Sequence, residues 1–548
     1  MSTCSEDLGL SSLACRLLRK NWASVPVAVA RLPGAVLCWS RADHFSDELA
    51  SRIAVRTDAN GTEIAWADRY GGAGIGGNGG SGRAALFSGM YLKGIGPTPL
   101  TGTTTHRYHT NGEVPLREAV GETIFAELFA HELPWGAVRS EAIIDTLSNI
   151  QPPFDPDHEG PVICERRVLL VREPPLRPAH FERAAHFTGP EALRGESDIR
   201  RIKQNKKMVL RGFGAQRIEA SLREFWGRWC EQYAYLYVWR VAAGAPSPSN
   251  VALDGRLLDF GASASLPDWN ATALFDGCPQ IGHEFPRLLE FLRRFYAAQD
   301  DVDLTRSQPK DAYVAALGDE CSRRYLRTVG VEMLRVAGLR RETVETAISV
   351  YRLNSRICDA AKIALRFYNR QFRLSVHASF EDFDFSDFWS DKTPSHLRAL
   401  RAIGDKIAMD VRGEPIRQRM HARCIPRTRL LNHLFRPRLL EELPLPKNGR
   451  PVNRSRVEDV IRREFTKSRR DSRLEPANAY PCGYAAIGSS SFALFRNLEG
   501  DCYALEEPAH AYSIGTKITT PIVPLPFTQN GTIDGRPVDA VHYSCAPQ

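Results

Sequence analysis

The sequence predicts an α+β protein with two lobes and a C-terminal extension. Strand patterns on both sides of a glycine-rich stretch indicate a strand-rich first lobe over residues 1–185. Long helical patterns over residues 285–440 indicate a mostly helical second lobe over residues 186–440. Residues 441–548 are richer in proline, glycine and serine, and they form a strand-rich extension to which the sequence assigns no role. With 548 residues, the chain is long enough for each lobe to have its own core.

Composition and charge exclude several classes of protein. A hydrophobic content of 43% and a charged content of 25% are typical of a soluble globular protein. The net charge of +8 is small for this length and argues against nucleic-acid binding. The basic cluster at residues 200–207 is expected to be a solvated helix face. The apolar stretch 27–38 contains Arg31 and Pro33 and is too short to span a bilayer, so no membrane partner is expected.

Cysteine usage and the first residues predict the compartment. The 12 cysteines are scattered and contain no Cys-x-x-Cys pair, which is typical of a reducing compartment and not of a disulfide-bonded or zinc-binding protein. The first residues lack the basic start and apolar run of a signal peptide. We therefore expect a cytoplasmic protein.

A glycine-rich stretch at residues 70–83 lies between strand patterns at 62–66 and at 84–87 and 90–93. It contains Gly74-Ile-Gly76-Gly-Asn-Gly79, which formally matches the dinucleotide-binding motif G-x-G-x-x-G. That motif should open a helix, whereas here another strand pattern follows, so a dinucleotide site is disfavoured. A glycine flap over nucleotide phosphates fits better. A flexible linker stays open as the alternative.

Helical patterns follow this region. Apolar residues recur every four positions from Leu116 to Leu128, and Pro134 follows as a stop signal, so a helix is expected over 116–133. Its glutamates Glu118, Glu122 and Glu127 are expected to face water unless a site recruits one of them. The remaining predicted elements are a strand over 162–171, an aromatic-rich core helix over 218–241, and helices over 285–298, 313–337 and 341–371.

The stretch from Asn250 to Gly261 predicts a β-hairpin, with short strands at 251–253 and 256–258 and a two-residue turn at Asp254-Gly255. In that register Asn250 faces Asp259, with Cβ atoms about 5 Å apart. An amide oxygen and a carboxylate at this spacing can bind one Mg²⁺, with phosphate and water completing its shell. A surface hairpin with a chance Asp-Phe-Gly is the alternative.

The order glycine flap, strand lysine, helix glutamate, Asn and Asp-Phe-Gly is that of a bilobal protein-kinase-like fold. In detail, residues 60–265 resemble the selenoprotein O (SelO/YdiU) family of protein adenylyltransferases. Gly80-Ser-Gly82-Arg83-Ala84 resembles the family's Gly-Asp-Gly-Arg-Ala, and Leu92-Lys93-Gly-Ile-Gly-Pro-Thr-Pro is similar to its Leu-Lys-Gly-Ala-Gly-Pro-Thr-Pro. Further matches in order are Leu116-Arg117 with Glu122 and Glu127, Leu176-Arg177-Pro-Ala-His180-Phe181-Glu182, and the spacing of Asn250 to Asp259.

The resemblance implies a set of site residues. Lys93 would contact nucleotide phosphates, and Glu122 would orient Lys93. Asn250 and Asp259 would hold Mg²⁺, which bridges phosphate oxygens. The other nucleotide-binding residues would be Gly74, Gly76, Gly82, Arg83, Arg172 and Arg177, of which the two last would clamp the outer phosphates with guanidinium groups.

The resemblance also implies an activity. In this family ATP is thought to bind in a reversed orientation, so that AMP is transferred to a Ser, Thr or Tyr hydroxyl of a protein or peptide. The expected cofactors are therefore ATP and Mg²⁺. Two alternatives stay open: a nucleotide-binding pseudokinase scaffold without catalysis, and a kinase-like phosphotransferase that modifies a peptide.

The chain departs from the family at several positions. Ser249 stands where the family has an Asp before its metal-binding Asn, and serine is a poor base at neutral pH. The glycine flap is shorter, and Ala73-Gly74 replaces a His-Gln pair. Cys278 and Cys545 lie roughly where family members carry a redox-linked pair, although two plain thiols are the simpler expectation.

Overall fold

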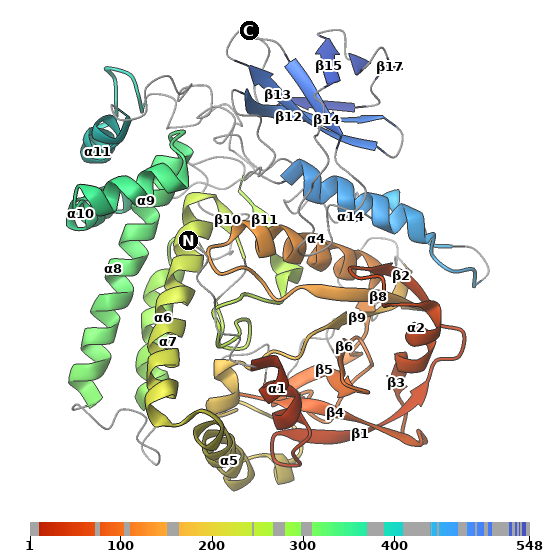
Figure 1. Cartoon of the computed structure of the whole chain (residues 1–548). Helices are drawn as coiled ribbons and strands as arrows, with labels where there is room; N and C mark the ends of the chain where they lie inside the picture. Colours follow the sequence, from red (N-terminus) through yellow and green to blue (C-terminus); the bar gives the residue numbers. More distant parts are fainter. Residues whose placement is uncertain are drawn as a thin grey trace, which may run out of the picture.

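The computed structural model describes residues 10–71, 77–103, 110–150, 164–243, 246–266, 280–297, 310–369, 388–408, 439, 441–446 and 449–468, and short strands between 479 and 543. This part of the chain is an α+β structure with one large antiparallel sheet, a group of long helices and a second antiparallel sheet near the C-terminus (Figure 1). No helix in the described ranges has both the length and the apolar character that a membrane span needs.

The large sheet contains the first nine strands. Its order is β2-β8-β9-β6-β5-β4-β1-β3, with β7 paired to β9. The predicted strands over 62–66, 84–87, 90–93 and 162–171 correspond to β4, β5, β6 and β9, so these predictions are confirmed within the described residues. The bounds are β1 (Ser24–Arg31), β2 (Val36–Ser40), β3 (Val55–Thr57), β4 (Glu63–Arg69), β5 (Gly80–Phe87), β6 (Met90–Lys93), β7 (Val114–Pro115), β8 (Ser140–Ile150) and β9 (Glu165–Arg172).

A tight turn fixes the register of β6. Phe87 pairs with Met90, and the two residues between them, Ser88 and Gly89, both have positive φ angles (50° and 84°). Such two-residue turns match the twist of the strands that they join. Lys93 is therefore paired with Ala84 on one side and with Leu170 of β9 on the other, at the end of a central strand.

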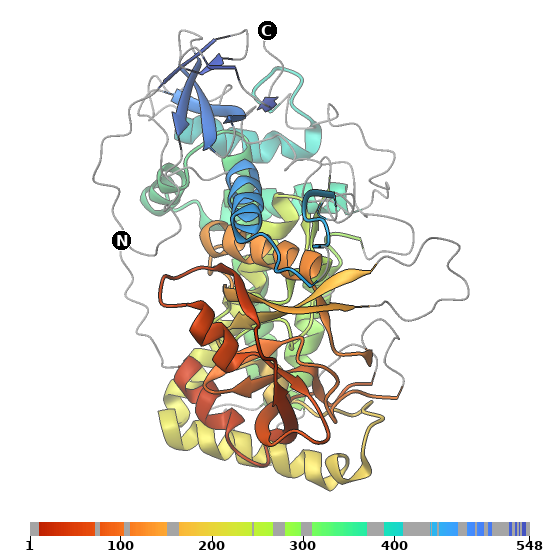
Figure 2. The same cartoon turned by 90° about the vertical axis from the view of Figure 1, so that its right-hand side faces the viewer.

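Helices surround this sheet on several sides (Figures 1 and 2). Helix α4 crosses next to β8 and β9, and the long helices α6, α7 and α8 stand together beside the sheet. The bounds are α1 (Leu10–Leu18), α2 (Asp47–Ile53), α4 (Leu116–Glu132), α5 (Glu196–Phe213), α6 (Ala215–Val238), α7 (Glu284–Ala297), α8 (Lys310–Val336), α9 (Arg341–Val350), α10 (Asn354–Tyr368) and α11 (Arg398–Ala408).

The main core lies between α4, α6, α7 and α8. The predicted helices over 116–133, 218–241, 285–298 and 313–337 are confirmed, with ends that differ by at most a few residues. The apolar stripe of α4 is buried, as are the aromatic side chains of α6, which therefore form core and not a binding surface. These aromatic residues are Phe225, Trp226, Trp229, Tyr233, Tyr235, Tyr237 and Trp239.

Two helical predictions are wrong in part. The single helix expected over 341–371 is two helices, because the chain turns at residues 351–353, where Arg352 has a φ of +51°. The basic cluster at 200–207 is not a uniformly solvated face of α5. Arg201 is fully buried and donates hydrogen bonds to the carbonyl oxygens of His180 (2.8 Å) and Glu182 (2.6 Å), and Lys206 is also buried.

The C-terminal region adds one helix and one sheet. Helix α14 (Arg454–Ser468) packs on α4, and it lies between α4 and the second sheet (Figure 1). The strand-rich character expected for residues 441–548 is confirmed for the described strands, which have the order β17-β16-β15-β14-β13-β12-β18. Their bounds are β12 (Ala479–Ile487), β13 (Ser490–Asn497), β14 (Cys502–Glu506), β15 (Leu525–Thr528), β16 (Thr532–Ile533), β17 (Arg536–Pro537) and β18 (Ala540–Tyr543).

A buried carboxylate fixes the start of this region to the large sheet. Asp145 of β8 is fully buried and pairs with Arg166 of β9 at 2.6 Å. The same carboxylate accepts a hydrogen bond from the backbone N–H of Val452 (2.9 Å), and Arg166 donates to the carbonyl oxygen of Arg450 (2.8 Å). Charge-assisted hydrogen bonds of this kind are stronger than neutral ones, so residues 450–452 are firmly held on the sheet.

Candidate functional site

Lys93 and Glu122 form a buried ion pair between β6 and α4. Lys93 lies at the end of β6, and Glu122 lies one turn after Glu118 on α4. The Nζ atom of Lys93 donates to Oε2 of Glu122 and lies 3.6 Å from Oε1 of Glu118. Only 6% of the Lys93 side chain and 3% of the Glu122 side chain are exposed. The sequence expectation of a lysine held by a helix glutamate therefore agrees with the geometry.

Asp259 faces three cations. Its Oδ1 atom lies 3.0 Å from Nη1 of Arg172 and 3.3 Å from Nζ of Lys93, and its Oδ2 atom lies 3.6 Å from Nη1 of Arg177. Burial alone would raise the pKa of this carboxyl group, but Arg172, Lys93 and Arg177 lower it well below its ordinary value, so the group is ionised. Its backbone is left-handed (φ 64°, ψ 66°), a strained conformation that this network of contacts can hold in place.

Arg172 and Arg177 are almost fully buried around this carboxylate. Arg172 is cross-strand to Tyr91, and its guanidinium group lies 5.5 Å from the centre of the Tyr91 ring. Arg177 is 1% exposed and lies 4.8 Å from the centre of the Tyr70 ring. The Nε atoms of both arginines are buried without a hydrogen-bond partner in the described structure. Two clustered guanidinium groups with unused donors are suited to binding an anion.

The predicted register of the 250–259 hairpin is wrong. Residues 251 and 257 form an isolated antiparallel bridge, and the backbone N–H of Leu258 donates to the carbonyl oxygen of Asn250 (3.1 Å). Leu258, and not Asp259, therefore lies opposite Asn250. The cause is a turn that is one residue longer than expected: its tip includes Leu253 as well as Asp254 and Gly255, and the Asp254 carboxylate accepts from the backbone N–H of Arg256 (3.0 Å).

Arg177 connects the two ends of this hairpin. Its Nη1 atom donates to the carbonyl oxygen of Ser249 and also lies near the Asp259 carboxylate, as given above. The Ser249 hydroxyl donates to Oδ1 of Asn250 (3.2 Å) and is within 2.8 Å of the Ser247 hydroxyl. Ser249 therefore orients the Asn250 amide. Cys278 and Cys545, for which two plain thiols were the simpler expectation, lie outside the described residues.

The glycine-rich stretch joins two paired strands, β4 and β5, as expected for a flap. Gly74 and Gly76 lie outside the described residues. Gly82 and Arg83 are part of β5, and the Arg83 guanidinium group pairs with Glu118 at 2.7 Å. Arg83 therefore reaches the same group of charges as Lys93, through the carboxylate that they share.

Four cationic side chains thus meet three carboxylates: Lys93, Arg83, Arg172 and Arg177 against Glu118, Glu122 and Asp259. These seven side chains together carry one excess positive charge, before the neighbouring Asp68 is counted. Asn250 and Asp259 supply one neutral and one ionised oxygen, which are donor types that Mg²⁺ accepts when phosphates complete its shell, but the observed register does not place the two residues opposite each other. Among the described residues, no three His, Cys, Asp or Glu side chains gather as a metal site of their own.

The sequence and the resemblance assigned no role in the site to several residues of this region. Glu118 was expected to face water, yet it pairs with Arg83; the four-residue spacing of Glu118 and Glu122, which puts both on one helix face, is the signal that indicates it. Glu127 is also buried, where it pairs with Arg139. Asp68 and His180 form a fully buried pair beside Arg177, with 2.8 Å between Oδ1 and Nε2.

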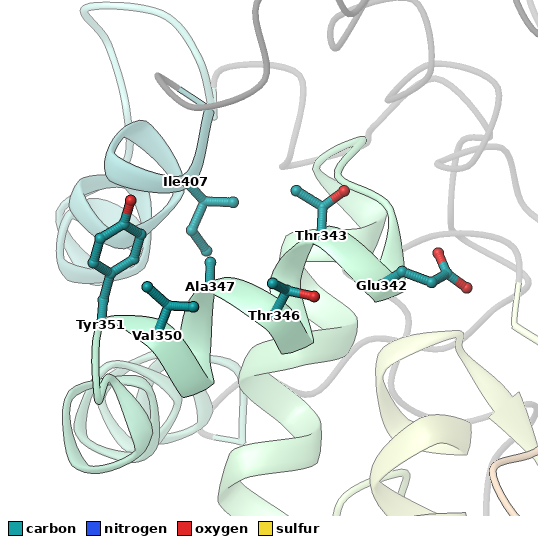
Figure 3. A pocket seen from close by; sticks show the side chains of 7 residues that line it. All are labelled: Glu342, Thr343, Thr346, Ala347, Val350, Tyr351 and Ile407. Carbon is teal, nitrogen blue, oxygen red and sulfur yellow. The ribbon is translucent and has the colours of Figure 1, made fainter. Parts of the chain in front are cut away.

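A separate surface pocket lies in the helical region and has a volume of about 400 Å³ (Figure 3). It is formed by one side of α9 and by the end of α11. It contains none of the site residues described above and has a single carboxylate at its edge. Its lining residues are Glu342, Thr343, Thr346, Ala347, Val350, Tyr351 and Ile407.

The chain was also compared with known proteins, through protein-family models and through curated sequences. No family model matches the chain, and no curated protein matches it significantly.

Proposed function

We propose that the protein is an ATP- and Mg²⁺-dependent transferase that attaches AMP to hydroxyl side chains of a protein or peptide. The proposal includes a bilobal, protein-kinase-like arrangement of the strand-rich and helical regions and a cytoplasmic setting. The observation that supports it best is the buried group of Lys93, Glu122 and Asp259 with Arg172 and Arg177. These residues come from β6, α4, the 250–259 hairpin and the chain at the end of β9.

Each residue of this group has a proposed task. Arg172 and Arg177 bind phosphate oxygens through guanidinium donors, of which both Nε atoms are unused in the described structure. Lys93, held by Glu122, contacts a phosphate at a fixed position because the ion pair restricts its rotamers. Asn250 and Asp259 hold Mg²⁺, which offsets charge on the phosphates when bound.

The transfer itself follows from the resemblance to the selenoprotein O family. The acceptor hydroxyl oxygen would attack the α-phosphorus, forming a new O–P bond. The bond between the α-phosphorus and the oxygen that leads to the β-phosphorus would break, and pyrophosphate would leave with that bonding pair. The hydroxyl proton would pass to solvent, because Ser249, at the expected position of the base, is a poor base at neutral pH.

That same observation favours a second candidate function. Ser249 donates to the Asn250 amide and orients it, and serine is too weak a base at neutral pH to take a proton from an acceptor. Loss of one positioned base typically lowers a rate by about 10²–10⁴-fold. A nucleotide-binding scaffold that regulates a partner without catalysis is therefore the alternative, and a kinase-like transfer of the γ-phosphoryl group to a peptide is another outcome that the test distinguishes.

The test uses the full chain with Mg²⁺ and ATP labelled on either the α- or the γ-phosphorus, and with the protein itself and cytoplasmic extract proteins as acceptors. We expect label in protein from α-labelled ATP only, and its loss in Lys93→Met. Asp145→Asn, which changes a carboxylate outside the site, should keep it. Label from γ-labelled ATP only would contradict AMP transfer and support phosphoryl transfer. Thermal stabilisation by Mg·ATP without label would support the scaffold, and no stabilisation would contradict all three.

A further inference from the structure

Arg177 is held by a buried polar network that the sequence did not indicate. The residue begins a short 3-10 turn, Pro178–Phe181, that contains His180. Nδ1 of His180 accepts a hydrogen bond from the backbone N–H of Arg177 at 2.9 Å. A ring nitrogen that accepts from a backbone N–H carries no hydrogen, so the other nitrogen, Nε2, must be the donor.

The donor nitrogen has a fixed partner. Nε2 of His180 lies 2.8 Å from Oδ1 of Asp68, and the second oxygen of Asp68 accepts from the Tyr91 hydroxyl at 3.3 Å. All three side chains are fully buried. Burial alone would raise the pKa of Asp68, but the adjacent His180 ring, the charge of Arg177 and the hydrogen bond from Tyr91 lower it below its ordinary value. The carboxylate is thus ionised and oriented from both sides.

The local backbone explains how an acidic side chain comes to lie here. Asp68 lies at an irregularity of β4, where the pairing with β5 shifts between Ala67 and Arg69. Gly80 of β5 passes so close that a Cβ atom there would lie 2.2 Å from the Asp68 carbonyl oxygen, and its φ is +147°. Only glycine allows this approach, so Gly80 is required for the irregularity of β4 at which Asp68 lies.

The 177–181 segment is also tied to the rest of the site. The backbone N–H of Gly71, at the start of the glycine-rich stretch, donates to the carbonyl oxygen of Ala179 (2.8 Å). The backbone N–H of Ala179 donates to the carbonyl oxygen of Pro248 (3.3 Å). Arg201 and Asn205 of α5 both donate to the His180 carbonyl oxygen, at 2.8 and 2.9 Å. The segment therefore connects the base of the glycine stretch with the residues that precede Asn250.

We infer that Asp68 and His180 are positioning residues for nucleotide binding, which act by fixing Arg177 through its backbone N–H. Asp68 fixes the orientation of the His180 imidazole, and the imidazole fixes the position of the Arg177 backbone N–H at the start of the 3-10 turn. The backbone in turn directs the Arg177 guanidinium group to the phosphate position. The Tyr91 hydroxyl donates to the same carboxylate and helps to orient it. The inference rests on the proposed nucleotide binding.

The test measures the affinity of the full chain for a fluorescent ATP analogue with Mg²⁺, together with the urea midpoint of unfolding. Asp68→Ala should weaken binding roughly tenfold or more, which is the size expected when a charged hydrogen bond is lost. Asp68→Asn can still accept from His180 and should recover most of the affinity. In an Arg177→Gln background, Asp68→Ala should cause no further loss, because the effect passes through Arg177.

A matched control separates positioning from general stability. Asp145→Ala removes another fully buried carboxylate of the same sheet, so it should lower the urea midpoint and leave the affinity unchanged. If Asp68→Ala does not fold, Tyr91→Phe replaces it and should weaken binding to a smaller extent, again only when Arg177 is present. Equal losses in both backgrounds, or wild-type affinity in the variants, would overturn the inference alone. No binding by the wild-type chain would overturn it together with the proposed function.

Discussion

Asp259→Asn is the most informative single substitution, because it removes one negative charge that faces three cations. Lys93 and Arg172 keep Glu122 as a partner, but Arg177 loses the ion-pair partner that the described residues give it. Removal of one partner of a buried ion pair costs about 3–5 kcal/mol. The Asp259 side chain is 25% exposed, so we expect the free energy of unfolding to fall by an amount near the lower end of that range, about 3 kcal/mol.

The same substitution should change how the protein responds to ATP without Mg²⁺. A triphosphate can replace the missing carboxylate against Arg172 and Arg177. A ligand present at 100 times its Kd stabilises the folded state by about 2.7 kcal/mol, which is close to the expected loss. Urea unfolding in the absence of Mg²⁺, measured with and without ATP, should therefore show that ATP raises the free energy of unfolding more in Asp259→Asn than in the wild type.

Glu332→Gln is the matched control for this prediction. It removes a buried carboxylate of α8 that pairs with Arg335 and Arg341, each at 2.6 Å. It should lower stability by a similar amount and leave the gain from ATP at the wild-type value. The explanation would be refuted if Asp259→Asn had the wild-type urea midpoint and gained no more from ATP than the wild type does.

Other parts of the structure give further predictions. Glu122→Gln should lower the initial rate of label transfer from ATP by about 10²–10³-fold, a range typical for the loss of one preorganised electrostatic contact, while the chain stays folded by circular dichroism. Burial raises the pKa of Glu182 to about 7, only partly offset by Arg294 and Arg201. Because the folded state then binds more protons at Glu182, the contribution of this residue to stability should fall from pH 5 to pH 8 by on the order of 3 kcal/mol, and Glu182→Gln should make the urea midpoint less dependent on pH. Asp145→Asn should weaken the hydrogen bonds that attach residues 450–452 to the large sheet and speed limited proteolysis there. An unchanged cleavage rate would contradict this role of Asp145.

The elements whose signals are local could be predicted from the sequence. The strand over 90–93 follows a Ser-Gly pair that suits a two-residue turn, and the structure has the same bounds. Helix α4 follows a four-residue apolar period and ends just before Pro134, as its stop signal indicates. The approach of Lys93 to Glu122 could be expected because the resemblance assigns the two residues to one site.

Features that depend on tertiary contacts could not be predicted. The break at Arg352 contains neither glycine nor proline, so the sequence has no stop signal between α9 and α10. In the 250–259 hairpin, whose register differs by one residue from the predicted one, the backbone N–H of Leu253 in the turn donates to the carbonyl oxygen of the distant Leu176 (2.8 Å). The pair of Asp68 and His180 joins residues 112 positions apart, and no periodicity relates side chains at such a distance.

The contact between α14 and α4 has a practical consequence for anyone who wishes to shorten this protein. Val457, Val460, Ile461 and Phe465 are buried, and the Phe465 ring lies 5.5 Å from the ring of His131 on α4. Removal of residues 441–548 would take α14 away from α4, the helix that carries Glu122, and would expose the apolar side of α4 to water. Expression of residues 1–440 alone should thus yield an aggregation-prone fragment. Helix α14 is therefore a structural support of the helix that positions Glu122 beside Lys93.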